Sequence, residues 1–120
     1  MHLHHINHKR ILTTGVLNTV VGQTAAHIEV ANMEPVRTTE VTVLVIDWNS
    51  GSPVILMNQS VLMLPNTLMS FNQNVTPFHY EIRLILPAHM NVIANTFATN
   101  ADSFTLAGLT MTEKQLKDLH

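Results

Sequence analysis

β-branched residues or leucine fill almost every position of residues 39–48 (TEVTVLVIDW), and this stretch contains neither glycine nor proline. The turn-forming sequence NSGSP follows it directly, at residues 49–53. A short apolar run bounded by turn residues is typical of a strand that is covered on both faces. The pattern therefore predicts a strand in the middle of a β-sandwich.

The second strong signal covers residues 78–86, where large apolar residues alternate with polar ones. The apolar positions, which share one face of a strand, are Phe78, Tyr80, Ile82, Leu84 and Leu86. The titratable positions on the opposite face are His79, Glu81 and Arg83. We expect this strand to pair with residues 39–48, to end at Pro87, and to expose its titratable row as a solvated outer surface.

Residues 24–32 (TAAHIEVAN) alternate as well. Ala26, Ile28 and Val30 fall on one face and His27 and Glu29 on the other, which predicts a half-buried strand.

Weaker extended segments follow, separated by turn signals. They are residues 54–57, 59–64, 67–71, 91–99 and 103–111. Near the C-terminus, Thr112 and Gln115 have the spacing of a capping box, so both a helical turn and a last edge strand remain open there.

These elements predict one all-β domain, an antiparallel β-sandwich of seven to nine strands over residues 24–120. Jelly-roll and immunoglobulin-like topologies both fit the pattern. The Cys–Trp–Cys signature of true immunoglobulin domains is missing, because the chain contains no cysteine.

Residues 1–23 are expected to form an N-terminal arm or connector ahead of the sandwich. Its apolar positions are Ile11, Leu12, Val16, Leu17, Val20 and Val21. One interpretation is that they form one or two short strands within their own sheet. The other is that they add to the open sheet edge of a neighbouring subunit, which would make them assembly residues.

Composition narrows the possible functions. Asp, Glu, Lys and Arg make up only 12% of the 120 residues and the net charge is −2, so copies repel one another weakly. The six Lys and Arg residues are not grouped, which argues against nucleic-acid binding. We expect no membrane partner, because no run of 18 apolar residues occurs, and the N-terminus lacks the apolar region of a secretory signal.

A catalytic or metal site finds little support in the sequence. No cysteine is present to bind metal or act as a nucleophile, and the common nucleotide, hydrolase and metalloprotease motifs are missing. The N-terminal histidines His2, His4, His5 and His8 have no nearby carboxylate, so we interpret them as a solvated arm. The expectation is a protein without enzymatic activity, cofactor or metal.

Residues 41–53 (VTVLVIDWNSGSP), 78–87 (FHYEIRLILP) and 91–100 together resemble small β-sandwich proteins of spore-forming Firmicutes, similar to subunits of spore-surface appendages and the exosporium. The resemblance implies a jelly-roll body whose N-terminal connector inserts into the preceding subunit, a part that residues 1–23 would play. In such subunits the connector carries cysteines, so this chain would assemble without covalent cross-links. Location on a spore surface, or outside the cell without a signal peptide, would follow.

Together these patterns predict a structural subunit that assembles with itself into a filament, surface layer or appendage. The alternative is a non-enzymatic module that binds carbohydrate or protein through loops at one end of the sandwich. Trp48, at a strand end, is the candidate stacking platform for that alternative, with core packing as its competing role.

Overall fold

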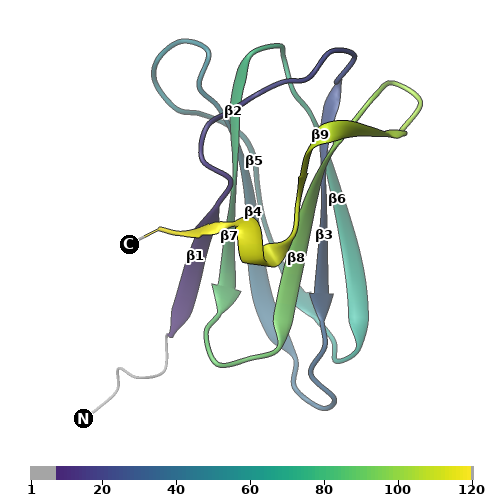
Figure 1. Ribbon diagram of the computed structural model, residues 1–120. Coiled ribbons are helices and arrows are strands. Elements are labelled where there is room, and N and C mark those ends of the chain that lie inside the picture. The colour runs from purple at the N-terminus through teal and green to yellow at the C-terminus, as the bar shows by residue number, and fades with distance from the viewer. Residues whose placement is uncertain (1–7, 120) are drawn as a thin grey trace.

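The computed structural model describes residues 8–119, which form two packed antiparallel sheets (Figure 1). The larger sheet has the strand order β10 (Lys117–Asp118), β1 (Lys9–Thr13), β7 (His79–Pro87), β4 (Thr39–Asp47) and β5 (Val54–Met63), with β2 (Leu17–Asn18) also paired to β7. The smaller sheet has the order β6 (Thr67–Asn74), β3 (Ala25–Asn32), β8 (Val92–Thr99) and β9 (Thr105–Met111). The expected all-β sandwich is confirmed.

The two strongest sequence signals, β4 and β7, are direct neighbours in the larger sheet. Val43 lies opposite Leu84 and Val45 opposite Ile82, and all four side chains are buried. The expectation that β4 is covered on both faces is wrong for its first half, because Glu40 on the outward face is exposed. The smaller sheet packs against only one face of the larger sheet. The outward side chains of β4 therefore have no second sheet to bury them.

Strand β7 follows the expected alternation except at its start. Tyr80, Ile82, Leu84 and Leu86 point into the core and are at most 2% exposed. Phe78 was expected on the same face but is 68% exposed. Its φ of 94° interrupts the extended backbone, so Phe78 lies before the strand and outside the alternation.

In the smaller sheet, β3 is the best-covered strand. It pairs along its whole length with β6 on one side and β8 on the other. Ala26, Ile28 and Val30 are fully buried, whereas His27 and Glu29 lie on the outer face, as their alternation predicts.

The C-terminal segment contains both of the structures left open by the sequence. A short 3₁₀ helix, η2 (Glu113–Gln115), follows β9, and Oε1 of Gln115 accepts a hydrogen bond from the backbone N of Thr112 at 2.9 Å. The chain then enters β10, which pairs with β1. It thereby crosses from the smaller sheet to the larger one and closes one side of the sandwich (Figure 1).

The strand order shares pairings with the immunoglobulin arrangement. The order β5-β4-β7 matches strands C′, C and F of that fold, and the neighbours β6 and β3 match strands E and B. The first and last long strands differ, because β1 takes the place of strand G beside β7, and β8 takes the place of strand A beside β3.

The inward face of β7 carries a testable consequence. Leu84→Ala removes a fully buried side chain, and we expect it to lower the free energy of unfolding by about 2–5 kcal/mol. His79→Ala, on the exposed outer face of the same strand, is the matched control and should cost less than about 1 kcal/mol. Urea denaturation of both variants measures the difference, and the reverse order would contradict the assignment of the two faces.

Candidate functional site

One side of the sandwich consists of two open strand edges. Strands β5 and β6 are the outermost strands of the two sheets, and they contact each other through the short connection at residues 64–66. Neither strand contains Asp, Glu, Lys, Arg or Pro. Monomeric proteins usually protect such edges with charges, prolines or covering segments, because an edge strand presents unpaired N–H and C=O groups. We call this side the open side.

Several exposed apolar side chains lie on or next to the β3–β4 and β5–β6 connections, at one end of the open side. Met33 and Leu68 line a common hollow of about 280 Å³. The group, which we call the apolar end, has exposures of 50% to 82% and consists of Met33, Val36, Leu62, Leu64 and Leu68. Leu62 and Leu68 lie on the outer faces of the two different sheets, so the group surrounds this end of the open side and does not form one continuous patch.

The opposite side of the sandwich is closed. The segment from β9 through η2 to β10 spans it, and Leu116 within this segment is buried. Arg10 of β1 forms an ion pair with Glu113 of η2 at 2.6 Å, and its Nη2 donates a hydrogen bond at 2.7 Å to the backbone O of Val92 in β8, which joins the two sheets. The outermost strand of the larger sheet here, β10, has only two residues, Lys117 and Asp118, and both are charged. The two edges of the larger sheet are therefore unlike, whereas β9, the edge of the smaller sheet on this side, is as free of charge and proline as β6.

The structure places three of the apolar N-terminal residues, Ile11, Leu12 and Leu17, in strands of the larger sheet. Strand β1 pairs with β7, and β2 pairs with β7 as well, which is the first of the two arrangements considered for this segment. Leu12 is 3% exposed in the core, and Leu17 packs against the core. The expected assembly residues thus include two that already have partners in their own molecule.

The remaining residues of that set are more accessible. Ile11 is 37% exposed, Val16 55% and Val21 99%, while Val20 lies close to Gly108 of β9. Of the histidine cluster, His2, His4 and His5 lie outside the described residues.

Glu81 corrects the expectation that the outer face of β7 is a solvated row. Glu81 is only 3% exposed and lies opposite Ile46 of β4. Trp48 Nε1 donates a hydrogen bond to its carboxylate at 2.9 Å, and Arg83 Nε donates another at 2.7 Å. Trp48 is therefore half-buried and bound to Glu81, which leaves it poorly placed as an open stacking platform.

The environment of Glu81 also determines its ionisation. Burial raises the pKa of this carboxyl group, but the hydrogen bonds from Arg83, Thr13 and Trp48 outweigh burial and hold the pKa below its ordinary value. The carboxylate is thus a stabilising charge with fixed partners.

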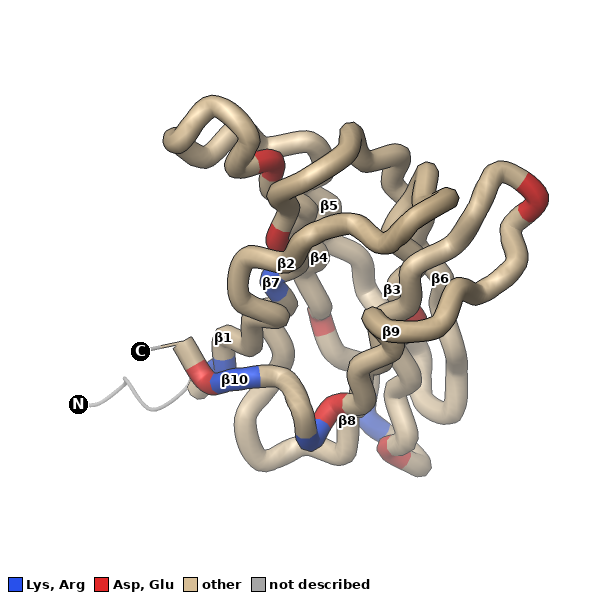
Figure 2. The backbone as a smooth tube through the Cα atoms, turned by 45° about the horizontal axis from the view of Figure 1, so that its top comes forward, with Lys and Arg blue, Asp and Glu red and all other residues tan. Residues whose placement is uncertain are grey.

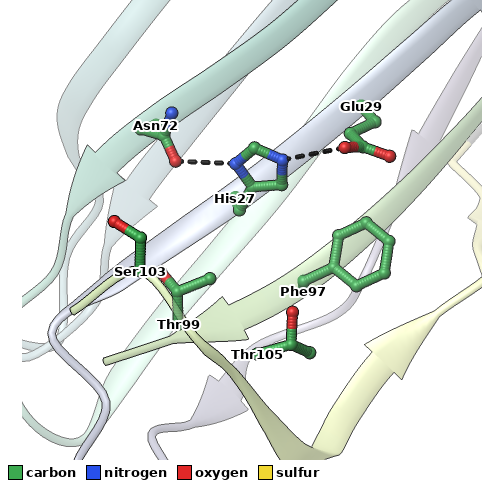
Figure 3. Close-up of a pocket in the computed structure, with 7 residues that line it drawn as sticks. All are labelled: His27, Glu29, Asn72, Phe97, Thr99, Ser103 and Thr105. Atoms are coloured by element: carbon green, nitrogen blue, oxygen red, sulfur yellow. Dashed lines mark hydrogen bonds and ion pairs between the residues drawn. The ribbon is translucent and has the colours of Figure 1, made fainter. Parts of the chain in front are cut away.

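A pocket of about 230 Å³ lies on the outer face of the smaller sheet (Figure 3). Three of its residues, Asn72 of β6, His27 of β3 and Phe97 of β8, lie opposite one another on adjacent strands. His27 Nδ1 is 2.7 Å from Oδ1 of Asn72, and its Nε2 is 3.1 Å from Oε2 of Glu29. The pocket is completed by Thr99, Ser103 and Thr105.

The sequence placed His27 and Glu29 on an outward face but gave no sign of their neighbours. Asn72 and Phe97 reach them only through the strand order β6-β3-β8. Alternation within one strand assigns a face and carries no information about the adjacent strand, so the pocket was missed.

Comparisons with known protein families, with curated proteins and with solved structures found no match. Within residues 8–119 no three His, Asp or Glu side chains are grouped so that they could hold a metal ion. In the same part of the chain, no helix has the length and apolar content needed to cross a membrane.

Glu81 gives a pH-dependent prediction. Because its pKa is lowered in the folded protein, its stabilising effect is complete above the ordinary glutamate pKa of about 4.3 and is lost as the pH falls through the folded value. Glu81→Gln should therefore be less stable than the wild type at pH 7, and the difference should shrink as the pH falls below about 4.3. Thermal melts across this range measure it.

Glu40→Gln is the matched control, because Glu40 is exposed and meets Lys9 only in a surface ion pair at 3.7 Å. It should change the melting temperature little at pH 7. A difference between Glu81→Gln and wild type that stays constant across the pH range would contradict the role of the Glu81 charge.

Proposed function

We propose that this protein is a non-enzymatic structural subunit that assembles with further copies of itself through the open side. The observation that carries the proposal is the pair of uncharged, proline-free edge strands, β5 and β6, on one side of the sandwich. A strand of a second copy can pair with such an edge through main-chain hydrogen bonds without bringing like charges together.

Electrostatics and surface apolarity support the same function. Charged residues are sparse along the backbone (Figure 2), and the net charge is only −2. Long-range repulsion between copies is therefore small. Contact between two copies would also remove exposed side chains of the apolar end from water, each square ångström of apolar area contributing about 25 cal/mol.

The unlike edges of the larger sheet favour pairing of like edges there. In this sheet, a head-to-tail contact would join the ten-residue strand β5 to the two-residue, charged strand β10. Pairing β5 with β5 of a second copy uses the same surface twice, and two antiparallel strands fit a two-fold axis. The expected unit of assembly is therefore a two-fold pair in which the larger sheet continues from one copy into the next.

A filament or surface layer, as expected from the resemblance to spore-appendage subunits, needs a second contact beyond this pair. The exposed residues of the N-terminal segment, Val16 and Val21, are available for it. Insertion of the complete segment into a neighbour would first require β1 to leave β7 and Leu12 to leave the core. Edge pairing needs no such rearrangement, so it is the preferred mode.

A lysine at the centre of the β5 edge tests the proposal. Gln59 lies opposite the inward-facing Val43 and is itself exposed. Gln59→Lys places a charge at the junction with the second copy. In the monomer, the lysine side chain at this exposed position stays in contact with water. We expect the full chain to form pairs or larger assemblies in light scattering after size exclusion, and Gln59→Lys to shift it to monomer.

Thr110→Lys is the matched control, because Thr110 is exposed on β9 at the opposite side and the substitution adds the same charge. It should leave the assembly unchanged, and thermal melts of both variants verify that they are folded. A monomeric full chain at high micromolar concentration would overturn the proposed function. Assemblies that tolerate Gln59→Lys would overturn the edge contact, and negative-stain electron microscopy then distinguishes filaments from closed pairs.

A further inference from the structure

The pocket on the outer face of the smaller sheet has the features of a preformed binding site. His27 is fixed from both ring nitrogens by Asn72 and Glu29, so three polar side chains on two strands hold one another in place. The ring of Phe97 packs beside His27, with ring centroids 5.8 Å apart and planes tilted by 45° (Figure 3). Mutual contacts of this kind reduce the entropy lost when a ligand orders a site.

The far wall of the pocket is also held in a defined conformation. Strands β8 and β9 change register between Thr96 and Ala98, so Phe97 has no direct partner on β9. Asn100 holds the loop between these strands: its Oδ1 accepts hydrogen bonds from the backbone N of Asp102 and of Phe104, each at 3.0 Å. Ser103, in this loop, has a φ of 65° and lines the pocket.

The unused polar atoms indicate the chemistry of a ligand. Among the described residues, Oε1 of Glu29, Nδ2 of Asn72 and the hydroxyls of Ser103 and Thr105 form no side-chain hydrogen bond within the protein. They offer a strong acceptor, a donor and two groups that can do both. Such a mixture fits a ligand with neighbouring hydroxyl groups, because each hydroxyl can both donate and accept a hydrogen bond.

Charge and size narrow the ligand further. The lining contains the carboxylate of Glu29 and neither Lys nor Arg, which disfavours phosphate, sulfate and carboxylate ligands. A volume of about 230 Å³ lies below the range of about 300–1,000 Å³ that is typical for drug-sized ligands, so the pocket suits a single ring. The half-buried face of Phe97 supplies the apolar contact that the C–H face of a sugar ring prefers.

We propose that this pocket binds one neutral sugar ring, with Phe97 as the apolar platform and Glu29, Asn72, Ser103 and Thr105 as hydroxyl partners. The site lies on the outer face of the smaller sheet, whereas the assembly contact proposed above centres on the edge of β5 in the larger sheet. A self-assembling subunit with this pocket would present one sugar site per copy, and the sum of many weak sites would give strong attachment to a glycan-bearing surface.

Nuclear magnetic resonance titration of the full chain tests the site directly. The probes are the methyl glycosides of glucose, galactose, mannose and N-acetylglucosamine, added to ¹⁵N-labelled protein into the high millimolar range. We expect saturable shifts for at least one of them, with a millimolar dissociation constant, at the backbone amides of His27, Asn72, Phe97 and Ser103. Absence of saturable shifts with all four probes would overturn the proposal.

Variants then identify the contacts. Phe97→Ala should weaken binding about tenfold, whereas Phe78→Ala, the same change at an exposed phenylalanine that precedes β7, should leave it unchanged. Thr105→Val removes one hydroxyl with little change in shape and should also weaken binding, which keeps the test decisive if Phe97→Ala fails to fold. Binding that tolerates both pocket variants would overturn the site.

The carboxylate and the aromatic ring could also attract an organic cation, and tetramethylammonium is the probe for this outcome. Saturable binding of tetramethylammonium in the pocket, with no binding of the glycosides, would replace the sugar by a cationic ligand and overturn the proposal. If both compounds bind and the glycoside displaces tetramethylammonium from the pocket, the result supports the proposal.

Discussion

The pairing of β4 with β7 is the interaction on which the rest of the structure depends. Both strands are buried on their inward faces, and each has a further strand on its other side, β5 beside β4 and β1 beside β7. The smaller sheet packs against the same inward faces through β3 and β8, whose small and branched side chains fill the core. Loss of this pairing would therefore remove the surface on which both sheets are assembled.

The two faces of β7 are buried by different interactions. Its inward side chains exclude water by apolar packing, whereas Glu81 on the other face is enclosed by Trp48, Arg83 and Thr13 through directed hydrogen bonds. A buried carboxylate is tolerated only with such partners, and removing one of them would leave a charge without compensation. Trp48, from the end of β4, thus fixes the outer surface at the place where the sheet lacks a second layer.

The sequence predicts much of the core and little of the site, for a physical reason. The strands β3, β4 and β7 were recognisable because period-two alternation is a local property of the chain. The burial of Glu81, the pocket at His27 and the open edge of β5 all depend on which strand lies beside which, and this order is set by contacts between distant segments. The exposure of Phe78 depends on a single backbone angle that alternation does not encode.

The closed side of the sandwich has a consequence for how the chain reaches its native state. Strand β1 obtains both neighbours late, since β7 and β10 follow it far along the chain, and the contact from Arg10 to Glu113 spans 103 positions. Closure of such long loops slows folding, and unpaired strands remain accessible in the meantime. During synthesis, β5 and β6 would emerge before β7 and β8 complete the larger and the smaller sheet, so nascent chains on neighbouring ribosomes could meet through these strands before either is complete.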